Sequence, residues 1–434
     1  MNKPKGTMDQ LPREVVKWQH VEGKFKEVCH RYGFDEIRTP TFEYTSLFKR
    51  GVGETTDIVQ KEMFTVISDA NLRKYHEGKF DLDKRGFTLK PEGTASVVRS
   101  FVENKLYAEA QPTKLFYITP CFRNENPQAG RLREFHQVGI ETLSSMNPAT
   151  DAEIIALAKD YFDELGLKDL SIKINSVGCK VCRPVYHEKL KSFLEPRLND
   201  LCETCQGRFH TNPLRILDCK VPTCQAAVKD APLLMDHLCE DCQTHFTGLK
   251  QSLEAFEVPF VVDPRIVRGL DYYTKTAFEI VSENIGAQST VCGGGRYDGL
   301  VEDVGGPRTP GVGFGLGIER LILTLEAEGV AFPEPEPTQV FIVILGDAPK
   351  LTGLGILKHL RDSGIKSEFD HLNRSLKAQM RYADKLGARY TLILGEEELK
   401  SREVTVKNMQ TSDQETVKID GVADYIAARL GGSR

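Results

Sequence analysis

The stretch 115–143, LFYITPCFRNENPQAGRLREFHQVGIETL, places two apolar segments on either side of a polar loop. Leu115–Thr119 and Gln137–Leu143 have the composition of paired strands, which predicts a hairpin. The loop carries three arginines that a purely structural hairpin does not need: Arg123, Arg131 and Arg133. Gln137 and Glu141 are four residues apart in the second strand, so their side chains point to one face of it. The hairpin therefore predicts a cationic loop beside a polar face.

A second stretch, RGLDYYT at 268–274, sets a fixed cation, Arg268, beside the hydroxyls of Tyr272 and Tyr273 within one apparent strand. Facing the polar face of the hairpin, these groups line a pocket for a small polar substrate. A pocket whose buried polar groups need partners rejects apolar analogues by roughly 10⁴-fold or more. The two stretches together predict a selective small-molecule site.

Three segments rich in glycine or proline accompany these stretches. FTLKPEGT at 87–94 predicts a strand and a turn that open a helix at Ala95, where Thr94 could cap the first free amides. GGGRYDG at 293–299 follows a strand near Ser289–Cys292, and a bulged turn explains it more simply than phosphate binding does. GVGFGLGIERL at 311–321 predicts a glycine-rich strand running into a helix, and it does not have the context of a dinucleotide fingerprint.

The chain has 434 residues and a formal net charge of −5. Its length suggests two or three domains, each with its own core, and its charge argues against a protein that coats nucleic acid nonspecifically. Met1–Gln10 lacks the apolar region of a signal peptide, and no run of about 18 apolar residues occurs. We therefore expect a soluble, cytoplasmic protein with no membrane segment.

Eight of the 11 cysteines fall between Val177 and His245. They form four close pairs: Cys179 and Cys182, Cys202 and Cys205, Cys219 and Cys224, Cys239 and Cys242. Three pairs have the C-x-x-C spacing that lets two thiolates meet one tetrahedral Zn²⁺ ion, and eight ligands could hold two ions. The alternative is an insertion domain at 177–255, packed by helices such as Tyr186–Leu198, whose thiols are buried without metal.

Both ends of the chain have clear helix or strand patterns. Pro12–Arg31 has apolar residues at helical spacing and predicts an amphipathic helix. FPEPEP at 332–337 predicts a stiff linker over 331–338. Beyond it, a βαβαβ order predicts a parallel sheet: strand Val340–Leu345, helix Pro349–Ser363, strand Ile365–Phe369, helix Ser375–Leu386 and strand Tyr390–Gly395.

In this order along the chain, the segments at 87–94, 115–143, 268–299 and 311–321 resemble the signature motifs of histidyl-tRNA synthetases, which are class II aminoacyl-tRNA synthetases. The resemblance implies an α+β fold, with an antiparallel sheet flanked by helices in a catalytic domain formed by 1–176 and 256–330. It also implies a C-terminal α/β anticodon-binding domain at 339–434, whereas the cysteine-rich insertion at 177–255 lies outside the resemblance. Phe34–Arg50 resembles motif 1, which in this family builds the interface of a homodimer.

The resemblance also implies substrate contacts. Those to L-histidine come from Glu92, Thr94, Gln137, Glu141, Arg268, Tyr272 and Tyr273. Glu92 faces the amino group, Glu141 and Tyr273 meet the imidazole, and Arg268 reaches both the carboxylate and the α-phosphate of ATP. The other contacts to ATP come from Arg123, Glu125, Phe135 and Arg320.

The chemistry implied is positioning and charge stabilisation without a protein nucleophile. Arg123 and Arg268 are the catalytic residues, because a guanidinium stabilises the charge that grows on the α-phosphate. Mg²⁺ holds the other phosphates. The tRNA-facing residues of the loop are Gln128, Arg131 and Arg133.

The resemblance predicts an ATP-dependent enzyme that forms histidyl adenylate and transfers histidine to the 3′ end of tRNA(His). Two noncatalytic relatives are the alternatives: the regulatory subunit of ATP phosphoribosyltransferase, and a tRNA-sensing module of the kind attached to a translation-factor kinase. The regulatory subunit lacks the anticodon domain and commonly loses ATP-site residues. This chain keeps Arg123, Glu125, Arg320 and a C-terminal domain, and no kinase segment is attached.

Overall fold

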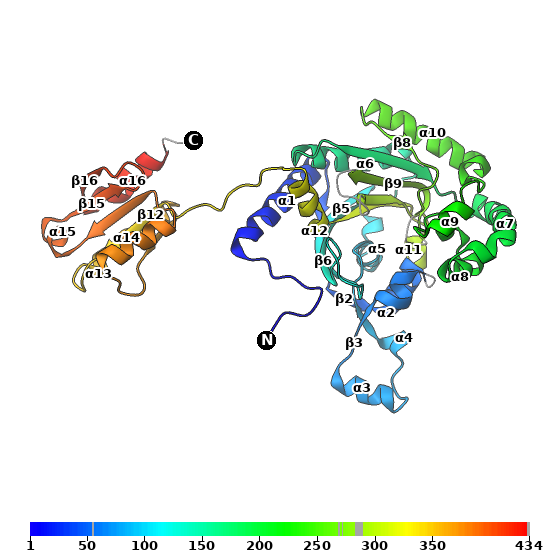
Figure 1. Cartoon of the computed structure of the whole chain (residues 1–434), viewed down its shortest axis with the longest axis horizontal. Coiled ribbons are helices and arrows are strands. Elements are labelled where there is room, and N and C mark those ends of the chain that lie inside the picture. Colours follow the sequence, from blue (N-terminus) through cyan, green and yellow to red (C-terminus); the bar gives the residue numbers. More distant parts are fainter. Residues whose placement is uncertain (54–55, 268–269, 271, 283–289, 432–434) are drawn as a thin grey trace. The chain divides into compact units, whose positions relative to one another are not determined.

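The computed structural model describes residues 1–53, 56–267, 270, 272–282 and 290–431, so Arg268 lies outside the described residues. The chain divides into two compact units, Met1–Pro333 and Glu334–Arg434, and Figure 1 shows the elements of each. Among the described residues, no helix has both the length and the apolar character needed to span a bilayer.

The first unit is built on an eight-stranded sheet in the order β1-β5-β6-β11-β10-β9-β7-β8. Its strands are β1 (Asp35–Glu36), β5 (Thr113–Phe122), β6 (Glu134–Leu143), β7 (Leu170–Ser176), β8 (Val261–Val262), β9 (Thr274–Ser282), β10 (Thr290–Arg296) and β11 (Gly311–Gly317). Within the described part of this sheet, only the edge pairs β1–β5 and β7–β8 are parallel. The expected largely antiparallel catalytic sheet is confirmed, as is the β5–β6 hairpin.

Helices cover this sheet: α1 (Pro12–Arg31), α5 (Thr94–Glu103), α6 (Pro148–Glu164), α10 (Glu240–Ala255), α11 (Leu300–Asp303) and α12 (Ile318–Ala327). The amphipathic pattern of α1 buries Val21 and Phe25 in a core shared with α6, α10 and α12. Val138 and Ile140 of β6 enter the same core. Because side chains alternate along a strand, Gln137 and Glu141 face the opposite side of the sheet, as predicted.

A smaller sheet of order β2-β4-β3 precedes α5 in the chain. It consists of β2 (Phe42–Tyr44), β3 (Phe64–Val66) and β4 (Phe87–Leu89), and its connections hold α2 (Thr45–Val52), the π-helix η1 (Ile58–Glu62), α3 (Asp69–His76) and α4 (Leu82–Arg85). Strand β4 leads directly into the turn before α5, so this sheet fixes where the helix begins.

The cysteine-rich insertion forms its own helical core. Its helices are α7 (Cys182–Leu194), η3 (Glu195–Asp200), α8 (Glu203–Thr211), η4 (Pro213–Ile216), α9 (Pro222–Ala227) and η5 (Leu234–His237). Tyr186, Leu190 and Leu194 of α7 pack around the buried cysteines. The insertion then continues into α10, which packs on α6 of the catalytic domain.

The second unit has a five-stranded sheet of order β13-β12-β14-β15-β16. The first three of these strands are parallel, as predicted, and β15 and β16 are antiparallel. The elements are β12 (Val340–Ile344), α13 (Lys350–Asp362), β13 (Ser367–Phe369), α14 (Leu376–Lys385), β14 (Tyr390–Leu394), α15 (Glu396–Ser401), β15 (Glu403–Asn408), β16 (Gln414–Lys418) and α16 (Val422–Gly431). Helix α15 was not expected; the Glu398 carboxylate accepts a hydrogen bond from the Gly395 N–H at its start (3.0 Å).

Candidate active site

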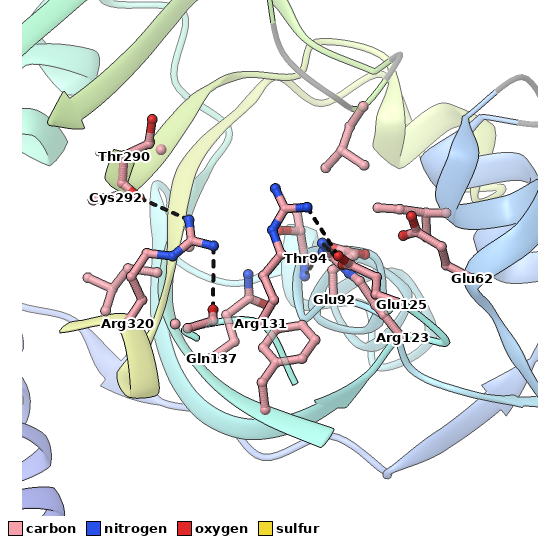
Figure 2. Close-up of a pocket in the computed structure, with 18 of the residues that line it drawn as sticks. Glu62, Glu92, Thr94, Arg123, Glu125, Arg131, Gln137, Thr290, Cys292 and Arg320 are labelled. Carbon is pink, nitrogen blue, oxygen red and sulfur yellow. Dashed lines mark hydrogen bonds and ion pairs between the residues drawn. The ribbon is translucent and has the colours of Figure 1, made fainter. Parts of the chain in front are cut away.

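A pocket of about 460 Å³ lies over β6, β10 and β11. It brings together predicted residues from four separate stretches of sequence, several of which are labelled in Figure 2: Glu92, Thr94, Arg123, Glu125, Arg131, Phe135, Gln137, Tyr272, Tyr273 and Arg320. The predicted histidine and ATP groups therefore share one cavity.

The glycines of β11 make room for the polar side chains of β6. A Cβ atom on Gly313 would lie 2.0 Å from Oε2 of Glu141, and one on Gly315 would lie 2.2 Å from Nε2 of Gln137. The two strands pair in register at Gly313 and Glu141. The glycine-rich strand is thus required by the side chains that lie across it, which is a packing reason that the sequence alone did not show.

Glu141 lies fully buried behind the pocket wall. Its Oε1 accepts hydrogen bonds from the hydroxyls of Thr94 (2.7 Å) and Tyr117 (3.2 Å), and its Oε2 accepts one from Tyr297. Burial raises the pKa of Glu141 to about 8, and the hydroxyl donors oppose this shift only partly. Of these partners, Thr94 reaches the pocket and links Glu141 to it.

Glu92 occupies the turn that opens α5. Its carboxylate accepts hydrogen bonds from the N–H groups of Thr94 and Ala95, both at 2.8 Å. Glu92 therefore satisfies the first free amides of the helix, and the alternative in which Thr94 caps them is wrong. Burial raises the pKa of Glu92, although these two N–H donors favour its charged form. An ammonium group entering the pocket would further stabilise this carboxylate.

The cations of the pocket come from the hairpin and from α12. Arg123 donates to the carbonyl of Pro91 (2.9 Å), and its guanidinium carbon lies 5.2 Å from the centre of the Phe135 ring. Arg320 donates to the carbonyls of Thr290 (3.0 Å) and Gly130 (3.5 Å), as Figure 2 shows. Burial lowers the pKa of Arg320, and the nearby positive charge of Arg131 lowers it further. An anionic ligand would relieve both effects.

Two local predictions about the substrate wall need correction. Tyr272 and Tyr273 precede β9, which begins at Thr274, so they do not lie within a strand. Lys275 has a φ of 50°, and the β9–β10 ladder changes register next to it. Because the regular alternation of side chains between the two faces of the sheet stops at this irregularity, consecutive residues before it can face the same way. Tyr272 and Tyr273, whose ring centres are 4.7 Å apart, both line the pocket.

The second correction concerns the triple glycine. Gly293, Gly294 and Gly295 lie inside strand β10 and not in a turn. A Cβ atom on Gly294 would lie 2.3 Å from the carbonyl oxygen of Gly313, so close packing against β11 explains the glycine there. The expected bulge is present, because the pairing of β10 with β9 changes register at two places. The turn follows at Asp298 and Gly299.

The tRNA candidates lie on the loop of the hairpin. Gln128 is exposed, and its backbone pairs with that of Arg131. Arg131 lies 3.4 Å from the Glu125 carboxylate, and the Arg133 side chain donates to the Glu125 carbonyl (3.2 Å). Of the three, Arg131 reaches the pocket lining, while Gln128 remains on the outer part of the loop.

Several pocket residues were missed from the sequence. Glu62 is the last residue of η1, and Asp57 is the residue before that helix. Arg215 comes from the insertion. Arg208 of α8 forms an ion pair with Asp57 (2.9 Å). No motif marks these positions, since they reach the pocket only through the fold. Tyr297 does not line the pocket but donates a hydrogen bond to Glu141, and its place in the motif GGGRYDG is the signal that could have identified it.

The eight cysteines form two separate clusters. The first contains Cys179, Cys182, Cys239 and Cys242, and the second contains Cys202, Cys205, Cys219 and Cys224. Within each cluster the four sulfur atoms lie within 4.8 Å of one another. Both sets thus have the number and chemistry of ligands that a structural Zn²⁺ site requires.

The first unit has the features of a class II aminoacyl-tRNA synthetase catalytic domain. These are a largely antiparallel sheet, Arg123 on the hairpin, and Arg320 on the helix that follows the glycine-rich strand. A family model described as histidyl-tRNA synthetase matches residues 6–187 and 209–321, and one described as anticodon binding domain matches residues 339–429. The chain belongs to the histidyl-tRNA synthetase family.

Full-length relatives agree with the family model. The chain is 54% identical to the histidine–tRNA ligase of Clostridioides difficile strain 630, over 98% of this chain and 99% of the relative. It is 50% identical to that of Pelotomaculum thermopropionicum, over 100% and 99%. The crystal structure of apo histidyl-tRNA synthetase from S. aureus is 39% identical, with a TM-score of 0.81, covering 98% of this chain and 99% of that one.

The chain is therefore an ATP-dependent enzyme that ligates histidine to tRNA. The alternative of a noncatalytic regulatory subunit is not favoured. A Bacillus halodurans C structure described as an ATP phosphoribosyltransferase regulatory subunit/histidyl-tRNA synthetase is 20% identical with a TM-score of 0.61, covering 91% of this chain and 97% of that one. That likeness concerns the fold alone.

Proposed function

We propose that the pocket binds histidine against Glu92, Thr94, Gln137, Tyr272 and Tyr273, and ATP against Arg123, Glu125, Phe135 and Arg320. The observation that carries this proposal is that both sets line one cavity. Arg123 stands between them, beside the ring of Phe135 and the turn that holds Glu92. Two substrates held side by side react faster because their relative position is already set.

The proposed first step is attack of the histidine carboxylate on the α-phosphate of ATP. Arg123 and Arg268 stabilise the charge that grows there, and diphosphate leaves. Removing one such contact costs about 10² to 10³ in rate. Tyr273 reads one imidazole nitrogen from the pocket lining. Glu141 is the proposed partner of the other nitrogen and is connected to the pocket through the hydroxyl of Thr94. Glu125 reads the adenine amino group. No side chain of the protein forms a covalent bond with substrate in this scheme.

We propose that Mg²⁺ accompanies ATP. This ion prefers oxygen ligands and is usually held by phosphates, waters and one or two carboxylates. Glu62 and Asp57 line the pocket and supply such carboxylates, and one oxygen of Asp57 also pairs with Arg208 (2.9 Å). Burial raises the pKa of Glu62, and the nearby charge of Glu125 raises it further. A cation beside Glu62 would relieve that repulsion, so the donor set fits the ion.

The proposed tRNA is tRNA(His), with Gln128, Arg131 and Arg133 facing its acceptor end and 339–434 binding its anticodon end. We also propose that the enzyme acts in the cytoplasm as a homodimer. Phe42 and Tyr44 on β2 are 50% and 56% exposed and both contact Phe87. Such an exposed aromatic cluster, in the segment that resembles motif 1, suits a subunit interface.

We propose that both cysteine clusters bind Zn²⁺. A hydrogen bond from the Cys205 backbone lowers the pKa of Cys202 to about 7, so its metal-binding thiolate is accessible near neutral pH. Bound zinc would tie separate segments of the insertion together.

Histidine-dependent exchange of diphosphate into ATP tests the residue roles. Tyr273→Phe should weaken histidine use while leaving ATP affinity nearly unchanged, because only the imidazole loses a partner. Arg123→Ala should slow the exchange even when histidine and ATP are both saturating. If Tyr273→Phe weakens ATP and leaves histidine unaffected, the two halves of the pocket have been assigned the wrong way round.

A further inference from the structure

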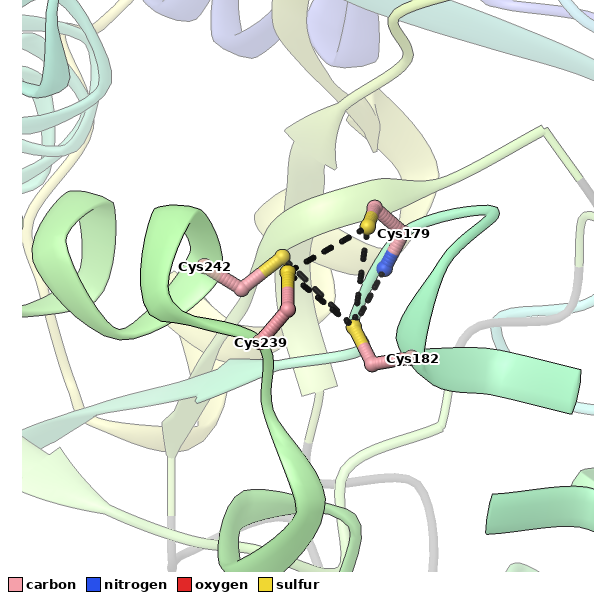
Figure 3. A group of neighbouring side chains, drawn as sticks. All are labelled: Cys179, Cys182, Cys239 and Cys242. Carbon is pink, nitrogen blue, oxygen red and sulfur yellow. Dashed lines mark hydrogen bonds between the residues drawn. The ribbon is translucent and has the colours of Figure 1, made fainter. Parts of the chain in front are cut away.

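The first cysteine cluster joins two loops that lie far apart in the sequence (Figure 3). Sγ of Cys182 lies 3.6 Å from that of Cys179, 3.9 Å from that of Cys239 and 3.7 Å from that of Cys242. Sγ of Cys179 lies 3.7 Å from that of Cys239. Four thiolates bonded to zinc at about 2.3 Å in a tetrahedron stand about 3.8 Å apart. The sulfur atoms therefore already have the spacing of a zinc tetrathiolate.

The first of these loops continues the catalytic sheet. Beyond the last paired residue of β7, the Val177 N–H donates to the Lys275 carbonyl (2.7 Å) and the Lys275 N–H donates to the Gly178 carbonyl (2.8 Å). Gly178 has a φ of +67°, and a Cβ atom there would lie 3.0 Å from Sγ of Cys182. Cys179 follows immediately, so this part of the cluster is attached to the segment at Lys275.

Arg183 connects the same loop to Tyr273. It follows Cys182 at the start of α7, and its backbone N–H donates to the Cys179 carbonyl (3.0 Å). Its guanidinium donates to the carbonyl of Val177 (2.8 Å) and to the carbonyl of Tyr273. The backbone of Tyr273, whose side chain lines the pocket, is thus held by a residue adjacent to a cluster cysteine.

The second loop holds the same segment from the other side. Asp241, between Cys239 and Cys242, forms an ion pair with Lys275 (2.7 Å). Lys275 is only 5% exposed and has a φ of 50°, a conformation that costs energy for any residue with a side chain. Such a conformation persists when the surrounding structure fixes it. Both loops of the cluster therefore fix the backbone at 273–275.

We propose that zinc in the first cluster positions Tyr273 for histidine recognition, with Arg183 as the positioning residue that transmits the constraint. The inference rests on the proposed contact between Tyr273 and the imidazole. The second cluster lies within the insertion, and the ion pair of its helix α8 is to Asp57 on another wall of the pocket. The segment between Cys205 and Cys219 lines a second cavity together with Tyr273, but the contacts that fix the backbone at 273–275 come from Arg183 and Asp241, which lie beside cysteines of the first cluster. Loss of the second zinc should therefore disturb Tyr273 much less than loss of the first, which makes the two clusters useful comparisons.

The test uses full-length protein, with zinc measured by elemental analysis and histidine binding by calorimetry. Cys239→Ser and Cys202→Ser each remove one ligand from a different cluster and should each lower zinc from about two ions to about one per chain. Cys239→Ser should weaken histidine binding by about ten- to a hundredfold, since a buried imidazole nitrogen left without its hydrogen-bond partner costs about one to two powers of ten in affinity. Cys202→Ser should leave it within about twofold. Equal histidine affinities in the two variants, or wild-type protein without zinc, would overturn the proposal.

Arg183 provides a test that does not depend on removing metal. Arg183→Met should keep both zinc ions and still raise the histidine Kd, with ATP affinity unchanged, and Arg183→Lys should restore part of the loss. If Arg183→Met binds histidine normally, the positioning role is overturned even where Cys239→Ser fails to fold. Tyr273→Phe distinguishes failure of the imidazole contact from failure of the positioning role. Normal histidine affinity in Tyr273→Phe refutes the imidazole contact itself. Reduced histidine affinity in Tyr273→Phe together with normal histidine affinity in Arg183→Met refutes only the positioning role.

Discussion

The substitution Glu141→Gln keeps the size of a fully buried side chain and removes its charge. The remaining oxygen can accept the hydrogen bonds of Thr94 and Tyr117, and the new amide can donate to the hydroxyl oxygen of Tyr297. Packing is therefore conserved. The variant and the wild type should differ mainly in how their stability responds to pH.

The magnitude follows from the raised pKa of Glu141. It lies at about 8 in the folded protein because of burial, against 4.5 for an ordinary glutamate. Between these values the folded state binds one more proton at this site than the unfolded state does. The free energy of unfolding therefore falls as the pH rises, by about 1.4 kcal/mol per unit and by about 5 kcal/mol over the window. Glutamine does not titrate, so the variant lacks this loss.

Denaturant unfolding of both full-length proteins between about pH 5 and 10 measures the difference, and contributions from all other groups cancel. The free energy of unfolding of Glu141→Gln minus that of the wild type should rise with pH and level off above about pH 8. Curves that stay parallel across this range would refute the argument from burial. In the same samples, histidine affinity should fall and ATP affinity should hold, and the reverse would refute the imidazole contact.

Three further changes test other parts of the molecule. Gly313→Ala places a Cβ atom against Glu141, so thermal unfolding should show a loss of about 1–3 kcal/mol, whereas Gly317→Ala, with open space around its Cβ position, should be nearly neutral. By its resemblance to the family, Gln128 lies near the extra guanosine at the 5′ end of tRNA(His), and we propose that it contacts this base. Gln128→Ala should leave adenylate formation nearly unchanged but reduce the preference for tRNA(His) bearing this guanosine over tRNA lacking it; an unchanged preference in aminoacylation assays argues against the base contact. Residues 339–434 make up the second compact unit except for its first residues, 334–338, which belong to the linker. Deleting 339–434 should weaken tRNA binding and leave histidine-dependent diphosphate exchange unchanged. Loss of exchange would mean that the catalytic unit needs this domain.

Periodicity predicted the parts of the site that regular strands carry. Gln137 and Glu141 face one side of β6 because side chains alternate, and Val138 and Ile140 face the core as that rule requires. The prediction that Tyr272 and Tyr273 lie within a strand is wrong, so alternation does not set their direction. A positive φ at Lys275 and a change of register decide their direction, and neither leaves a pattern in the sequence.

Contacts between distant segments were also beyond prediction. Asp57 and Arg215 belong to segments without a motif, and only the folded chain brings both to the pocket. The spacing of the cysteines suggested two metal sites but did not show which cysteine pairs share a site. The first cluster takes its two pairs from opposite ends of the insertion, 57 residues apart from Cys182 to Cys239, because the fold brings the start of α7 next to the start of α10.

The order of strands in the catalytic sheet has a consequence for synthesis of the chain. Strand β6 ends at Leu143, and its partner β11 begins at Gly311. At about 5–20 residues per second, the ribosome needs roughly 10–30 s to supply that partner. During this interval the hairpin that carries Arg123 has an unpaired edge, while the insertion, complete earlier, can already fold around its cysteines. An unpaired strand edge is a template for pairing with another chain, so the nascent hairpin is exposed to intermolecular strand pairing until β11 emerges.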